Sequence, residues 1–297
     1  MNNRTKGLIL SIFSASLWGI GGNFTQYIFA HSTFTYMPLV TIRMFLTGII
    51  VLLIGIYLEG FDKAKKMLQD RNTRLKLYIY SVFGMIGVQV PFFATIQYSS
   101  APFATLIQFS TPLIIMIYIS LRTKKMPTNN EIASTLTILA GVFLVVTNGN
   151  LETLIVDKKA ILWGITTACG FAFYLLYAKE FFSWPTTFTM GYGMLLGSIE
   201  LFIFLPNKNI FIHFTDIKVI LAFLFMVIFG TIIPFYFFVE SIRYISAKLT
   251  SILSVAEPIV SLFVAVIFFK DVFGIIQLIG VFLVIVSVLI IGLFAKE

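Results

Sequence analysis

The sequence contains ten long apolar segments, each of a length that suits a membrane-spanning helix. They lie at about residues 7–29, 36–58, 76–98, 101–122, 130–148, 160–181, 186–206, 217–239, 248–269 and 273–294. A helix needs roughly 20 apolar residues to cross ~30 Å of hydrocarbon. The segments are continuously apolar rather than alternating, which does not suit a membrane β-barrel. The sequence therefore predicts an all-α integral membrane protein with ten transmembrane helices.

Composition excludes the soluble classes of protein. Hydrophobic residues make up 59% of the 297 residues and charged residues only 11%, whereas soluble domains have roughly 25% charged residues. So few charged side chains cannot cover the surface of a soluble protein of this size. A soluble enzyme, a nucleic-acid-binding domain and a disordered chain are excluded. The net charge of +8 then reflects loops that orient the helices, and not a nucleic-acid partner.

The distribution of Lys and Arg predicts the orientation of the helices. With the N-terminus in the cytoplasm, 15 basic residues fall on the inner side, 5 on the outer side, and Arg43 inside a helix. Six of the inner residues belong to one loop, at positions 63, 65, 66, 71, 74 and 76. Positive charge accumulates in cytoplasmic loops. We expect both termini in the cytoplasm.

The two halves of the chain are similar to each other. Residues 84–112 align with residues 230–258 at a constant offset of 146, with eight of 29 positions identical. The identities include a shared Tyr-x-Ser-Ala turn and the pair Pro112 and Pro258. Each half then carries five helices, at 1–150 and 151–297, and an odd number of helices inverts the second copy. Inverted repeats are typical of transporters that bind solute near the bilayer midplane and work by alternating access.

Several motifs together resemble the EamA-type transporters of the drug/metabolite transporter superfamily. They are, in chain order, Trp18-Gly19, Arg43, Tyr98 to Ala101, Pro112, Tyr244 to Ala247 and Glu257-Pro258. The resemblance covers residues 6 to 294 approximately. It implies a protein that exports amino acids or other small metabolites across a bacterial plasma membrane, through a cavity between the two halves.

Glu257 is the strongest candidate for a functional residue. It lies near the middle of its helix, where an unpaired carboxylate costs several kcal/mol. Thr250, Ser254, Glu257 and Ser261 follow one another at steps of four, three and four residues, so the four polar side chains share one face of the helix. We expect Glu257 to line a cavity and to bind a cation or carry a proton. The alternative is a protonated residue hydrogen-bonded to a neighbouring helix beside Pro258.

Arg43 lies seven residues into the second expected helix, about 10 Å from the outer end of that helix at 1.5 Å per residue. Its side chain can extend outward to lipid headgroups. Alternatively, it can pair with Glu200, which lies at a similar depth in the seventh segment. Whether those two helices touch is not determined by the sequence.

The remaining candidates are weaker. The repeat equivalents of Glu257 and Ser254 are Thr111 and Gln108, so the predicted site is charged in one half only. Further polar candidates inside the apolar segments are Asn23, Gln89, Tyr174, Tyr177 and Tyr192, although each tyrosine also suits simple packing or an interface position. Expected helix breaks are Pro91, Pro112, Pro234 and Pro258.

Catalytic and cofactor motifs are not found in the sequence. It has no phosphate-binding G-x-x-x-x-G-K-[ST] and no H-E-x-x-H, and its two histidines fall in expected outer loops. We therefore expect no cofactor, no metal and no enzyme activity. The preferred function is a secondary transporter of a small metabolite, with protons as a candidate coupling ion. The alternative is an integral-membrane enzyme or an accessory scaffold.

The predicted orientation can be tested by cysteine labelling. A Leu68→Cys variant should not react with an impermeant maleimide added to intact cells, and it should react once the cells are opened. Labelling of the intact cells would contradict the predicted orientation, as would a reporter fused at Lys296 that is active only outside the cell.

Overall fold

The computed structural model describes residues 3–124, 126, 129–150, 156–214, 216–241, 244–245, 250, 253–254 and 256–294, and the described elements are helical. The first half contains α1 (Asn3–His31), α2 (Tyr36–Glu59), α3 (Phe61–Gln69), α4 (Arg71–Ile79), η1 (Tyr80–Ile86), α5 (Gly87–Tyr98), α6 (Ala101–Gln108), α7 (Thr111–Thr123) and α8 (Asn129–Thr147). The second half contains α9 (Lys158–Tyr177), η2 (Ala178–Phe181), α10 (Thr186–Phe204), η3 (Ile210–His213), α11 (Ile217–Val227), η4 (Ile228–Ile232), α12 (Ile233–Ser241), α14 (Ala256–Val264), η5 (Ala265–Phe269) and α15 (Ile275–Phe294).

These helices confirm the predicted class of fold. Seven helical segments of the described chain are long and apolar enough to cross a membrane. Three shorter apolar stretches, Leu136–Val145, Ala256–Phe269 and Ile275–Ser287, fall in the fifth, ninth and tenth predicted segments. The described helices thus account for all ten predicted segments, as an all-α membrane protein requires.

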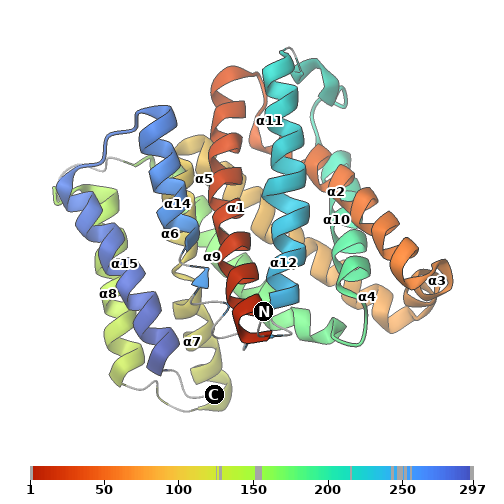
Figure 1. The fold of residues 1–297 in the computed structure, drawn as a ribbon, viewed down its shortest axis with the longest axis horizontal. Coiled ribbons are helices and arrows are strands. Elements are labelled where there is room, and N and C mark those ends of the chain that lie inside the picture. Colours follow the sequence, from red (N-terminus) through yellow and green to blue (C-terminus); the bar gives the residue numbers. More distant parts are fainter. Residues whose placement is uncertain are drawn as a thin grey trace.

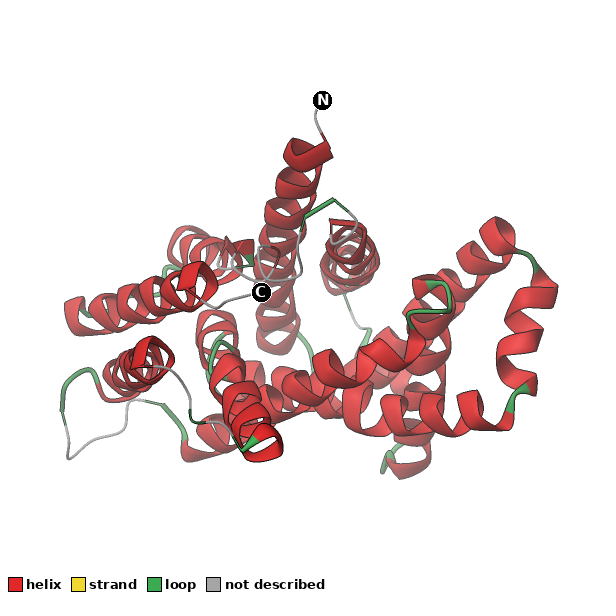
Figure 2. Ribbon diagram, turned by 90° about the horizontal axis from the view of Figure 1, so that it is seen from below, coloured by secondary structure: helices red, strands yellow, loops and turns green. Residues whose placement is uncertain are grey.

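The helices pair in the manner expected of two inverted repeats. The second helices of the two repeats, α2 and α10, pack against each other, and so do the fifth helices, α8 and α15. The first helix of each repeat packs against the third helix of the other: α1 contacts α11, η4 and α12, while α9 contacts η1 and α5. In Figures 1 and 2, α8 and α15 lie together at one end of the molecule and α3 and α4 lie at the other. This exchange of partners places the first and third helices of both repeats at the centre.

Glycine allows the central helices to approach closely. At the crossing of α1 and η4, a Cβ added to Gly21 would lie 2.7 Å from the Cα of Gly230. At the crossing of α9 and α5, a Cβ added to Gly170 would overlap the carbonyl of Gly87. Small residues favour such contacts because apolar lipid provides little hydrophobic drive for helices to associate. Each crossing joins the first helix of one repeat to the third helix of the other.

Two of the predicted helix breaks coincide with these crossings. Pro91 and Pro234 lie within α5 and α12, and each follows a π-helical segment, η1 or η4. Because proline has no N–H, the carbonyl four residues earlier loses its helical partner, and these carbonyls belong to Gly87 and Gly230. The helices continue through both prolines, so the expected breaks appear as π-helical segments at close helix crossings.

The other two prolines stand next to interruptions of a helix. The helix is interrupted at residues 109–110, and Pro112 lies at the start of α7, where the Thr111 hydroxyl donates to the Gln108 carbonyl at 2.6 Å. Pro258 lies in the first turn of α14, where Glu257 N–H donates to the Ser254 carbonyl at 2.9 Å. Each of these two prolines therefore lies within four residues of a non-helical position of the chain.

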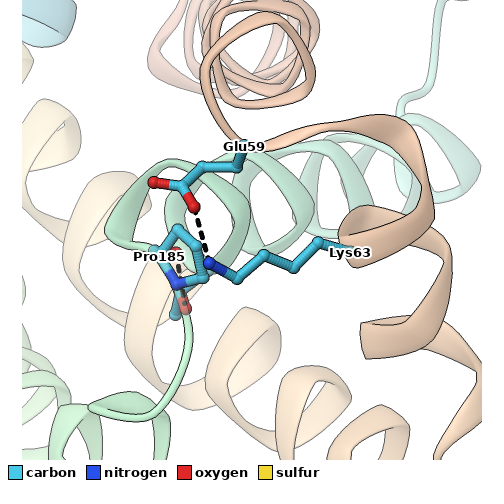
Figure 3. A network of polar contacts seen from close by, with 4 residues as sticks. Glu59, Lys63 and Pro185 are labelled. Atoms are coloured by element: carbon cyan, nitrogen blue, oxygen red, sulfur yellow. Dashed lines mark hydrogen bonds and ion pairs between the residues drawn. The ribbon is translucent and has the colours of Figure 1, made fainter.

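The short helix α3 and the N-terminus of α1 lie on the same side of the molecule, toward the bottom of Figure 1, and α15 ends on that side too. Helix α3 is held to the bundle by its buried residues Ala64 and Met67, and the Ala64 carbonyl accepts from the Tyr192 hydroxyl at 3.1 Å. Lys63 forms an ion pair with Glu59 at 2.6 Å, close to Pro185 (Figure 3). This pair is exposed, so it adds little stability.

The glycine crossing at α5 and α9 can be tested with two substitutions at one contact. Gly170→Ala should destabilise the protein by about 1–3 kcal/mol, because the new methyl group overlaps backbone that cannot move aside. Gly87→Ala is the matched control, since its Cβ would lie 3.6 Å from the nearest atom. The thermal unfolding midpoint of each purified variant measures the effect. Equal losses in the two variants would contradict the packing described for this crossing.

Candidate substrate-binding cavity

A cavity of about 70 Å³ lies at the centre of the molecule, where helices of both repeats meet. Its lining includes four of the predicted site residues, Arg43, Gln89, Gln108 and Glu257. The rest of the lining is aromatic, aliphatic or small: Trp18, Gly21, Gly22, Thr25, Val88, Phe92, Phe93, Phe171, Met226, Gly230 and Phe235. A pocket between helices with an apolar wall and a few converging polar groups is the usual form of a small-molecule site.

Arg43 projects from α2 into this centre, with only 3% of its surface exposed. Its Nη1 donates to the Thr231 hydroxyl at 2.8 Å, and its Nη2 donates to the Gln89 side-chain oxygen. The guanidinium carbon lies 4.2 Å from the centre of the Phe93 ring. Arg43 is therefore held among uncharged groups inside the protein and does not extend outward to headgroups, which was one of the two alternatives from the sequence.

The predicted ion pair between Arg43 and Glu200 is not formed, although α2 and α10 pack against each other. The ion pairs Lys63–Glu59 and Lys76–Glu180 involve neither Arg43 nor Glu200. Glu200 lies outside the cavity lining, and its Oε2 atom is buried without a hydrogen-bond partner. Arg43 and Glu200 lie at similar depth in adjacent helices, but they do not form an ion pair, because the Arg43 side chain points toward α5 and η4.

Glu257 lines the cavity from the first turn of α14, with 6% of its surface exposed. The four polar residues predicted to share one face of its helix make different contacts. Ser261 is fully buried and accepts from the Asn23 amide at 3.1 Å, while the Thr250 carbonyl accepts from the Ser11 hydroxyl at 3.2 Å. Of the four residues on this face, Glu257 alone belongs to the cavity lining, and Ser254 lies at the start of the break before it.

The two repeats supply different chemistry at equivalent positions of the wall. Gln89 and Phe235 are repeat equivalents at the offset of 146, and both line the cavity. Gln108 lines the cavity, and its equivalent Ser254 does not. Thr111, the equivalent of Glu257, instead donates to the carbonyls of Gln108 and Ala168 and so caps the break in its helix. Glu257 thus lines the cavity while its equivalent Thr111 does not, and the basic residue of the wall, Arg43, comes from the first repeat.

The other predicted residues do not line the cavity. The Asn23 amide donates to the Gly19 carbonyl at 2.9 Å and to the Ser261 carbonyl at 3.0 Å, which links α1 to α14. Tyr192 donates to α3, and Tyr177 stacks on Phe173 at 5.0 Å. Tyr174 stacks on Phe171 and meets Phe235 edge-on, so it packs behind two aromatic rings of the wall.

Sequence reasoning missed the aromatic part of the wall and the hydroxyl that binds Arg43. Phe92, Phe93, Phe171 and Phe235 line the cavity, but the chain contains 33 phenylalanines, so residue type gave no signal. Thr231 stands out only through the alignment of the repeats, one residue after the shared Gly230. Helix pairing decided which aromatic side chains face the centre.

Comparison with known proteins places the chain in one family. The model of the EamA-like transporter family matches twice, at residues 5–147 and 158–293. The "Uncharacterized inner membrane transporter YicL" of Salmonella typhimurium (strain LT2) is 32% identical over 100% of this chain and 98% of its own length. The "Uncharacterized transporter YyaM" of Bacillus subtilis (strain 168) is 25% identical over 83% of this chain and 81% of its own. A crystal structure with 15% identity has the same fold, with a TM-score of 0.65 over 98% of both chains.

The inverted helical bundle with a central cavity is that of a membrane transporter, a protein that takes a small-molecule substrate within a lipid environment and is not an enzyme. The chain belongs to the EamA-like transporter family, which the motifs in its sequence already resemble. The alternatives of a membrane enzyme or an accessory scaffold are set aside by this membership.

The position of Arg43 predicts which residues are energetically coupled to it. A double-mutant cycle of Arg43→Gln and Gln89→Ala should show a coupling of about 0.5–3 kcal/mol, because the two side chains share a buried hydrogen bond. The matched cycle of Arg43→Gln with Glu200→Gln should be additive within about 0.5 kcal/mol. Unfolding of the purified variants measures both. Coupling to Glu200 in place of Gln89 would overturn the described position of Arg43.

Proposed function

We propose that this transporter exports amino acids or related amphipathic solutes across a bacterial plasma membrane by alternating access, with both termini in the cytoplasm. Residues 1–150 and 151–297 form its two repeats. The observation that carries the proposal is the cavity between the repeats, whose wall contains one buried guanidinium, one buried carboxyl group and several aromatic rings. Such a wall suits a solute that combines a charged or polar group with an apolar part.

Alternating access is supported by the exchange of helices between the repeats. Each glycine crossing joins the first helix of one repeat to the third helix of the other. Motion at one crossing has an equivalent motion at the other on the opposite side of the membrane, because the repeats are inverted. Rocking of such repeats about a central site would open the cavity to each side in turn.

Glu257 has two candidate roles in this mechanism. It can bind the amino group or another cationic group of the solute, or it can carry a coupled proton. Its position supports both roles, since it is almost fully buried and faces the cavity beside a break in its helix. Ionisable groups inside membrane helices are commonly parts of a substrate or proton pathway.

Glu257→Gln tests this role, because it keeps the shape and size of the side chain while removing its titration. Cells or proteoliposomes loaded with radiolabelled amino acids report the rate of transport between pH 5.5 and 8.5. If Glu257 carries the proton, the variant should lose pH-dependent transport and keep exchange of solute. If Glu257 binds a cation, affinity should fall at least about tenfold at every pH.

Glu59→Gln is the matched control, because Glu59 is an exposed carboxylate paired with Lys63 at the end of α2. It should transport like the parent. A Glu257→Gln protein that transports like the parent at all these pH values would reject both roles. Absence of solute flux in the parent protein, across a panel of amino acids, would reject the proposed substrate class.

A further inference from the structure

Arg43 is a buried cation whose hydrogen-bond partners in the protein are all uncharged. They are the Thr231 hydroxyl and the Gln89 side-chain oxygen, and the Phe93 ring covers the guanidinium. Neither ion pair of the described residues involves Arg43. A charged side chain inside a membrane helix is costly and is usually paired. Arg43 therefore lacks an anion among the described groups.

The guanidinium also has an unused donor. The Arg43 Nε–H is buried and has no hydrogen-bond partner, whereas Nη1 and Nη2 are each held by a side chain. These two bonds come from η4 and α5, one helix from each repeat, and they fix the guanidinium at the cavity wall. Nε–H and a hydrogen on a neighbouring terminal nitrogen form the planar pair of donors that binds a carboxylate with two parallel bonds.

We propose that Arg43 is the receptor for a carboxylate of the transported solute, which supplies the missing anion when it enters the cavity. The proposal rests on the proposed function, since it takes this cavity as the transport site. The available space of about 70 Å³ compares with roughly 10–15 Å³ for one water molecule on the same measure. The volume of the cavity is therefore large enough for a carboxylate of a few heavy atoms, which reaches the buried Nε–H by a local adjustment of the Arg43 side chain.

Glu257 contributes a carboxyl group to the same cavity wall, and it does not form an ion pair with Arg43. A solute that carries both a carboxylate and an ammonium group could contact the two residues at once. A solute with an ammonium group alone would leave Arg43 without an anion. The cavity should consequently select carboxylates, and amino acids over their amides or esters.

The test uses acetate and its neutral analogue acetamide as probes of the purified full-length protein. Trp18 lines the cavity, so tryptophan fluorescence reports binding. At constant pH and ionic strength, acetate should bind at least about tenfold more tightly than acetamide, because only acetate gains a charge-assisted pair of hydrogen bonds. Equal binding of the two probes, or tighter binding of acetamide, would overturn the proposal.

Arg43→Gln should lose the preference for acetate. Without a carboxylate present, its thermal unfolding midpoint should equal or exceed that of the parent, because a buried unpaired charge has been removed. Arg71→Gln is the matched control, since Arg71 is exposed at the start of α4, and it should keep the preference. A purely structural Arg43 would instead give an Arg43→Gln protein that is less stable and still prefers acetate.

Arg43→Lys keeps the charge and loses the planar pair of donors, so it should prefer acetate over acetamide with weaker binding of acetate. It replaces Arg43→Gln if that variant does not fold. Binding of the probes does not depend on transport. Selective acetate binding without amino-acid flux would therefore support Arg43 as the carboxylate receptor and reject the proposed substrate class. Amino-acid flux without selective acetate binding would support the proposed substrate class and reject Arg43 as the carboxylate receptor.

Discussion

The arrangement of the bundle depends on two backbone contacts between helices, Gly21 with Gly230 and Gly170 with Gly87. In a lipid environment the apolar faces of helices gain little by meeting one another, so close packing and hydrogen bonds must hold the bundle together. Each contact brings the first helix of one repeat against the third helix of the other. The polar cavity forms where these crossed helices meet α2, α6 and α14.

The two prolines beside the crossings change the backbone hydrogen bonding at the same places where the repeats pack together. Pro91 and Pro234 each release a carbonyl that belongs to a glycine of a crossing, Gly87 or Gly230. Two nearby π-helical segments, η1 and η4, occupy equivalent places in the repeats. Thr231, in η4, accepts from Arg43 and donates to the Met226 carbonyl at 3.0 Å. The irregular segment therefore presents a side chain to the cavity as well as allowing close approach.

The charged groups of the site are buried without being paired with each other, whereas buried charges in proteins are usually paired. Arg43 and Glu257 are both nearly fully buried, and no ion pair of the described residues joins them. Uncharged groups fix the guanidinium, and one of its donors remains unused. Such an arrangement costs stability unless a ligand compensates it, which is typical of a binding site rather than of a structural element.

The sequence by itself determined the class of fold, the ten helices and the internal repeat, and it offered Arg43, Glu257, Gln89 and Gln108 as candidate site residues. Apolar length, the 146-residue offset and the rarity of polar residues in lipid are local properties that can be read from the chain. Tertiary structure decided that Arg43 meets Thr231 and Gln89 and not Glu200, and that Tyr192 binds the α3 backbone. The physical reason is that the direction of a side chain depends on which helices cross at its level, and those crossings are fixed by glycine pairs far apart in sequence.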